Sequence, residues 1–212
     1  DCSDLLSLGK TVLPRSMLQI HYRSKYRELI AFSNAAFYGN HLSVPVRHPE
    51  NVIQNIRPIE VVRVDGIYAN QTNRDEAEKV VDLLAERWSS PDRPSIGVVT
   101  FNSKQVDLIE DILAVRAEND PAFRQALSHE RDRQQGGEDM GFFVKNVENV
   151  QGDERGMIIF SSTFGRDENG SFRRQFGLLS QTGGERRLNV AITRAREKVI
   201  LVTSLPINEI SE

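Results

Sequence analysis

The 212-residue sequence contains a single cysteine, Cys2, so no disulfide bond can form within the chain. Its longest apolar runs are far too short to cross a bilayer, and no signal-peptide pattern is present. Internal repeats and heptad patterns are also missing. These absences exclude a disulfide-stapled scaffold, a membrane-spanning protein and a coiled coil, and we expect a protein of the reducing cytoplasm.

The sequence lacks a complete P-loop for binding phosphates. Residues 9–11 (Gly-Lys-Thr) match the end of that motif, but the motif requires a glycine where this chain has Asp4. No strand precedes the segment, and no acidic Mg²⁺-binding motif follows any later strand, so we predict no metal ligands. We interpret residues 1–17 as a linker, and the start at Asp1 instead of Met suggests a piece of a longer protein.

The composition is that of an ordinary globular chain, with 39% hydrophobic and 27% charged residues. This is enough for one good core, so one compact domain is the simplest expectation. The formal charge of −3 hides a bias, because 21 of the 27 basic residues are arginine. Arginine suits bidentate phosphate contacts better than lysine does. However, no stretch interleaves basic and aromatic residues, so we do not expect this domain alone to bind nucleic acid strongly.

Apolar runs that alternate with helical patterns predict an α/β fold. The predicted strands are 59–64, 96–100, 142–147, 157–162 and 199–203. One helix begins after Asn73, a plausible N-cap with Glu76 three residues later, and a second covers 106–113. The last three runs are dense enough to be buried on both faces, as central strands of a parallel sheet are. The pattern therefore predicts a doubly wound parallel sheet.

Two polar segments interrupt this pattern. Residues 114–141 carry mixed charges and a Gln-Gln-Gly-Gly tract, which together predict a charged insertion with a short helix and a mobile loop at the surface. Residues 162–184 contain five glycines and three arginines, so we expect a loop there.

The segment 184–196 concentrates four arginines next to a hydrophobic strand. On a helix, its apolar residues form one stripe: Leu188, Ala191, Ile192 and Ala195. Arg194 at the edge of such a helix, beside a cleft, would be a good charge stabiliser for phosphoryl transfer. A solvated basic helix face explains the segment equally well.

Four segments together resemble a known family. Residues 20–24 (Ile-His-Tyr-Arg-Ser), 96–101 (Ile-Gly-Val-Val-Thr-Phe), 146–155 and 184–196 are similar, in order and spacing, to motifs IV, IVa, V and VI of superfamily 1 helicases. The similarity is strongest to the group that includes the nonsense-mediated-decay helicase and its large bacterial relatives. It extends over nearly the whole chain, and four ordered motifs are much more specific than any one of them.

The resemblance implies that the chain, over 1–212, is a single RecA-like domain, with a parallel β-sheet between helices, and the second motor domain of a helicase. In that family the P-loop and the Mg²⁺ carboxylates belong to the first motor domain. ATP with Mg²⁺ would therefore be bound mainly outside this chain, and the isolated chain is expected to be inactive. The expected partners are the N-terminal RecA-like domain and single-stranded DNA or RNA, without a membrane.

Individual site residues follow from the same motif match. Arg23 and Arg194 are expected to be the arginines that reach the γ-phosphate when the cleft between the two domains closes. The nucleotide-binding loop of motif V is matched by Gln151, Gly152 and Glu154. Thr100 and Asn146 are expected to contact the nucleic-acid strand, with the Thr100 hydroxyl donating to a phosphate.

Other interpretations remain open at this point. Glu154 could pair with Arg155 or Arg186 on the surface, and Gly152 could be only a turn residue. The domain could also be a non-catalytic nucleic-acid-binding or regulatory module, or a platform for protein interactions. Two arginines converging on one cleft would favour the motor, because a binding module has no need of them.

Overall fold

The computed structural model describes residues 9, 11–13, 20, 24–43 and 48–210. The predicted site residue Arg23 and most of the linker predicted over 1–17 lie outside these residues.

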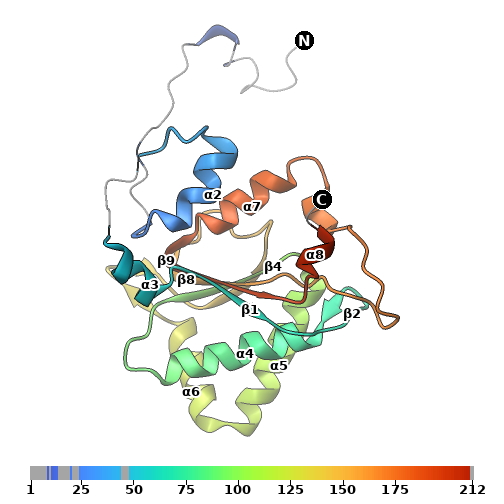
Figure 1. Ribbon diagram of the computed structural model, residues 1–212. Coiled ribbons are helices and arrows are strands. Elements are labelled where there is room, and N and C mark those ends of the chain that lie inside the picture. The colour runs from blue at the N-terminus through green and yellow to red at the C-terminus, as the bar shows by residue number, and fades with distance from the viewer. Residues whose placement is uncertain (1–8, 10, 14–19, 21–23, 44–47, 211–212) are drawn as a thin grey trace.

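A five-stranded parallel sheet forms the centre of the molecule (Figure 1). Its strands are β1 (Ile59–Arg63), β4 (Ile96–Thr100), β7 (Phe143–Asn146), β8 (Arg155–Ser161) and β9 (Ala195–Thr203). They lie in the order β1-β9-β8-β4-β7, and every neighbouring pair is parallel. All five predicted strands are present. Every residue of β4 and β8 is buried, which agrees with the apolar runs at their centres.

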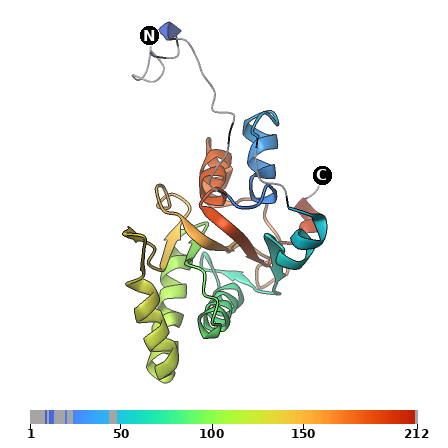
Figure 2. The ribbon, with the colours of Figure 1, turned by 90° about the vertical axis from the view of Figure 1, so that its left-hand side faces the viewer.

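Helices cover both faces of the sheet, as Figures 1 and 2 show. One face carries α4 (Arg74–Ser89), α5 (Ser103–Asn119) and α6 (Pro121–Arg131), and the other carries α2 (Glu28–Phe37) and α7 (Gly184–Ile192). The remaining elements are α3 (Glu50–Ile56), η1 (Gly177–Ser180), α8 (Ile207–Ile210) and two hairpins, β2 (Tyr68–Ala69) with β3 (Thr72–Asn73) and β5 (Gln134–Gln135) with β6 (Glu138–Asp139).

Helix α4 begins where the sequence predicts it. The side chain of Asn73 accepts a hydrogen bond from the amide of Glu76 at 3.1 Å, which satisfies one unpaired donor of the first turn. The predicted apolar stripe is buried against the sheet, and Trp88 at its end packs on the rings of Phe123 and Phe142. The glutamate side chain itself does not cap the helix; it turns into the protein interior.

The charged segment 114–141 is more ordered than predicted. Helix α5 continues to Asn119, and the short helix that we expected is α6. The loop that we predicted after it is instead the hairpin β5–β6, tied back by an Arg133 carbonyl that accepts from the Met140 amide. Asp120 caps α6 and Pro121 follows at its first position, a local start signal that the charge pattern obscured.

The arginine-rich helix α7 is shorter than the helix that the apolar stripe predicts. It ends at Ile192, and Ala195 already belongs to β9. The reason is the neighbouring strand, because the Arg194 carbonyl accepts a hydrogen bond from the Arg155 amide at 3.1 Å. Pairing with β8 therefore replaces the next helical turn, and the prediction that Ala195 extends the helix is wrong.

Candidate functional site

Residues predicted from two separate motifs meet at the amino-terminal edge of the sheet. Strands β8 and β9 start side by side, with Arg155 in register with Ala195. The loop that carries Gln151, Gly152 and Glu154 leads into β8, and Arg194 leads into β9. The parallel sheet thus brings this loop next to Arg194, although about forty residues separate them in sequence.

The Arg194 side chain is held against the end of α7. Its Nε atom donates to the Val190 carbonyl at 2.9 Å, and one terminal nitrogen donates to the Thr193 hydroxyl at 3.2 Å. The carbonyl end of a helix carries partial negative charge, which favours a cation at this position. These bonds keep a permanently charged, partly buried guanidinium group at the amino-terminal edge.

Glu154 forms an ion pair with an arginine that we did not consider for it. The Nε atom of Arg196 lies 3.2 Å from the Glu154 carboxylate, and a terminal nitrogen of Arg196 lies 3.4 Å from Glu138. The surface ion pair proposed as an alternative role for Glu154 is therefore present, but with Arg196 in place of Arg155 or Arg186. Arg196 links the loop to the hairpin β5–β6, whereas Arg194 bonds back to α7.

Gly152 gives this loop an open backbone. Its φ is +94°, a conformation that strains other residues, and among the described residues no atom beyond its two chain neighbours lies within 4 Å of the position that a Cβ would take. Gln151 beside it is exposed. A ligand at this edge could approach the main chain of the loop closely.

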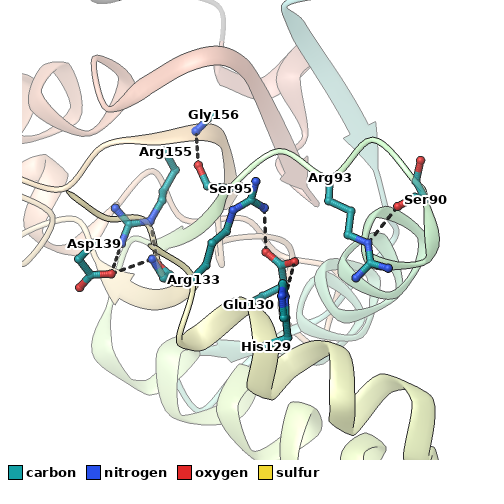
Figure 3. A network of polar contacts seen from close by, with 10 residues as sticks. Ser90, Arg93, Ser95, His129, Glu130, Arg133, Asp139, Arg155 and Gly156 are labelled. Carbon is teal, nitrogen blue, oxygen red and sulfur yellow. Dashed lines mark hydrogen bonds and ion pairs between the residues drawn. The ribbon is translucent and has the colours of Figure 1, made fainter. Parts of the chain in front are cut away.

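A buried arginine fixes the end of the loop. Arg155 is only 5% exposed; its guanidinium donates to the carbonyls of Gly141 and Glu154 at 2.8 and 2.7 Å and lies 4.9 Å from the Phe143 ring centre. Burial lowers the pKa of Arg155 below its usual value. Figure 3 shows it beside Asp139 of the hairpin, while Ser95 accepts the Gly156 amide. The sequence did not predict this role, because no nearby residue distinguishes Arg155 from the other arginines of the chain.

Thr100 and Asn146 lie at the opposite, carboxyl-terminal edge, where they are partners in the β4–β7 ladder. Thr100 is fully buried, and its hydroxyl donates to the Asn102 carbonyl. The Asn146 side chain accepts the Glu148 amide at 3.1 Å. Both side chains therefore serve local structure here, and their contact with a nucleic-acid strand stays a prediction.

The carboxyl-terminal edge also contains a buried cluster that the sequence did not reveal. Glu76 is 0% exposed and accepts four hydrogen bonds of 2.7–2.8 Å. The donors are the hydroxyls of Ser161 and Ser162 and the amides of Thr163 and Ser204. Burial raises the pKa of Glu76 above its usual value, and these four hydrogen bonds offset part of the shift.

Gln105 extends the Glu76 cluster to the β2–β3 hairpin. Its side chain accepts the Asn73 amide and donates to the Asn73 carbonyl, both at 2.8 Å, and it also donates to the Ser161 hydroxyl. The first turns of α4 and α5 and the ends of β8 and β9 are thereby joined by buried hydrogen bonds.

In the part of the chain that the structure describes, no helix is both long enough and apolar enough to cross a membrane. In the same residues, no three His, Cys, Asp or Glu side chains are grouped so that they could hold a metal ion.

The comparisons with known proteins agree on one family. A family model described as an AAA domain matches residues 3–205. An uncharacterized ATP-dependent helicase of Mycoplasma genitalium is 42% identical over 187 residues, and its homologue in Mycoplasma pneumoniae is 40% identical over 190 residues. Each match covers 88% of this chain but only 16% of the relative, so the chain spans about a sixth of these helicases.

Among solved structures, the C-terminal domain of a possible DNA helicase from Lactobacillus plantarum matches with a TM-score of 0.49 and 16% identity. The match covers 87% of this chain and 89% of that domain.

Proposed function

Because the chain belongs to the AAA-domain family formed by the C-terminal domains of superfamily 1 helicases, we propose that it is the second motor domain of a longer ATP-dependent helicase. In this proposal the N-terminal RecA-like domain of the same protein binds most of the ATP and Mg²⁺, and this chain contributes charge from across a cleft. The observation that carries the proposal is the meeting of Arg194 with the loop of Gln151, Gly152 and Glu154 at one edge of the sheet. We place the reaction in the cytoplasm.

Arg194 has the chemistry for this role. The hydrogen bonds that its side chain donates to Val190 and Thr193 go to neutral oxygens. Closure of the cleft would exchange these bonds for bidentate, charge-assisted bonds to phosphate oxygens, which are stronger. The charge on the transferred phosphoryl group is then stabilised mainly when the cleft is shut, and hydrolysis becomes coupled to domain movement. We propose Arg23 as the second arginine of this site.

The strand is proposed to bind at the other edge, near Thr100 and Asn146. Strand β8 connects the two sites, since the nucleotide-facing loop enters one end and the Glu76 cluster holds the other. Single-stranded DNA or RNA would thus bind to the same sheet that moves as one rigid body when ATP is hydrolysed. We propose translocation in the 5′-to-3′ direction, on the strength of the group resemblance.

Replacement of Arg194 in the full-length helicase tests the proposal. Arg194→Ala should lower the stimulated turnover number about a thousandfold or more, while ATP binding weakens only modestly. Arg194→Lys should restore little of the turnover, because the ammonium group of lysine cannot make the paired hydrogen bonds of the planar guanidinium group. The matched control is Arg186→Ala on the preceding helix α7, because the Arg186 side chain is 82% exposed and its loss should not affect turnover.

Near-normal turnover of Arg194→Ala would contradict the motor role and would favour a non-catalytic regulatory module. The isolated 212-residue chain serves as a second control, since we expect no ATPase activity from it with or without nucleic acid. Turnover by the isolated chain that Arg194→Ala abolishes would contradict the proposed division of labour.

A further inference from the structure

A cavity of about 550 Å³ opens at the carboxyl-terminal edge of the sheet. Its lining includes Tyr68 and Gln71 of the β2–β3 hairpin, Asn102 after β4, Phe164 after β8, and Arg173 of the following loop. This volume falls in the range of about 300–1,000 Å³ that is usual for small-ligand sites. Of the site residues predicted from the helicase motifs, none that the structure describes lines it.

The cavity lies where the sheet topology favours a ligand. Strands β4 and β8 are neighbours, but the chain leaves β4 for α5 on one face and β8 for α7 on the other. The ends of two such strands diverge and leave a crevice, which is the usual ligand position in open α/β sheets. Asn102 and Phe164, which follow these two strands, both line the cavity.

Hydrogen bonds, some of them buried, hold the cavity walls in place. Thr163, at a strained φ of +67°, is fixed by Glu76 and positions Phe164. Three contacts fix the hairpin. The Asn102 side chain donates to the Gln71 carbonyl at 2.9 Å, and the Tyr68 amide donates to the Arg166 carbonyl at 2.8 Å. The Gln105 side chain hydrogen-bonds both the amide and the carbonyl of Asn73. The walls are therefore preorganised, so binding would cost little ordering of the chain.

The chemistry of the walls suits a nucleotide. The ring of Tyr68 is partly exposed and lies 5.4 Å from that of Phe164, which is buried in an aromatic cluster with Phe101 and Phe176. A supported aromatic ring is a stacking surface for any base. The amide side chain of Gln71 can pair with a base edge, and the exposed Arg173 can contact a phosphate.

We propose that this cavity binds one unstacked base of a single-stranded nucleic acid, with Tyr68 as the stacking surface and Arg173 on the adjacent phosphate. Thr100 then acts indirectly, because its hydroxyl holds the Asn102 carbonyl at the cavity wall. The inference rests on the proposed function only in taking the ligand to be nucleic acid.

Titration of the ¹⁵N-labelled 212-residue chain with pentathymidylate or pentauridylate, followed by NMR, tests the proposal at the high concentrations that weak binding requires. The amide signals of Tyr68, Gln71, Asn102 and Phe164 should shift. The signal of Gln125, in a cavity of about 460 Å³ between α4 and α6, should not shift. Tighter binding of either oligonucleotide supports the site, and pentadeoxyuridylate, which differs from pentauridylate only in the sugar, then identifies the preferred sugar.

Variants make the test specific. Tyr68→Ala should weaken binding about tenfold or more, and Tyr68→Phe should bind like the original chain, because stacking needs only the ring. Arg173→Gln should reduce the slope of log affinity against log salt by about 0.7, the value for one single-strand phosphate. Arg174→Gln, the same charge change at a residue outside the cavity lining, should leave the slope unchanged.

Three outcomes would overturn the proposal: no shifts at millimolar oligonucleotide, shifts confined to other parts of the chain, or unchanged binding by both Tyr68→Ala and Arg173→Gln. Arg194→Ala should leave this binding intact. Failure of the motor role and failure of the base site are therefore separate results.

Discussion

The two edges of the sheet use charge in opposite ways. At the amino-terminal edge, Arg196 is shared between Glu154 and Glu138, and these three side chains are 37%, 19% and 69% exposed. At the carboxyl-terminal edge, Glu76 is completely buried and is held by neutral hydroxyl and amide donors. The first arrangement can exchange partners at little cost, whereas the second cannot.

This difference matches what each edge is proposed to do. Ion pairs that are partly solvated can rearrange when a second domain and a nucleotide approach. A buried carboxylate that joins the ends of β8 and β9 to α4 instead fixes geometry. The comparison suggests a domain that is adaptable at the edge proposed to meet ATP and rigid at the edge proposed to bind a strand.

The largest effect on stability is expected from the buried edge. Each oxygen of Glu76 accepts one backbone amide and one hydroxyl. In Glu76→Gln, the amide nitrogen must face one of these backbone donors, which leaves a buried N–H unpaired and should lower the free energy of unfolding by about 2–3 kcal/mol. Denaturant unfolding measures this loss. Glu138→Gln, at the exposed edge, is the control and should change stability by less than about 0.5 kcal/mol.

A smaller effect is expected at the amino-terminal edge. Arg196→Gln removes both ion pairs of that arginine, yet it should destabilise the fold by less than about 1 kcal/mol because its partners are solvated. Raising the ionic strength from about 0.1 to 1 M should remove most of this deficit, since the Debye length falls from about 10 to 3 Å. The Glu76→Gln deficit should not respond to salt. If salt reduced the stability losses of Arg196→Gln and Glu76→Gln equally, the two edges would not differ in how they use charge.

The pH dependence of stability gives the finest comparison. Because burial raises the pKa of Glu76 above its ordinary value of 4.5, the folded protein binds this proton more tightly than the unfolded chain does. Stability from this group is therefore complete below pH 4.5 and is lost as the pH rises through the raised value. The advantage of the original chain over Glu76→Gln should shrink between pH 4.5 and 7.5 in parallel unfolding curves. An advantage that grows with pH would show that the hydrogen bonds outweigh burial.

Local patterns in the sequence were enough for the strands and for the start of α4. Dense apolar runs predicted all five strands of the sheet, and Asn73 marked the cap. The start of α6 was also encoded locally, in Asp120 and Pro121, but the surrounding charges concealed it.

The Glu76 cluster could not be predicted in this way. Its carboxylate meets Ser161 and Ser204, which are 85 and 128 residues away in sequence. Only the folded sheet brings these residues together, and in the sequence Glu76 has the position of an ordinary first-turn helix residue. The partner of Glu154 was missed for the same reason, since Arg196 reaches it through the pairing of β8 with β9.

The most direct test of the proposed motor role compares ground-state and transition-state binding in the full-length protein. The affinities of the original protein and of Arg194→Ala would be measured for ADP alone and for ADP with aluminium fluoride, which mimics the transferred phosphoryl group. If Arg194 stabilises that group across the cleft, Arg194→Ala should hardly change ADP binding but should weaken the aluminium fluoride complex by a factor close to its loss in turnover. Equal weakening of both complexes, or of neither, would contradict the account.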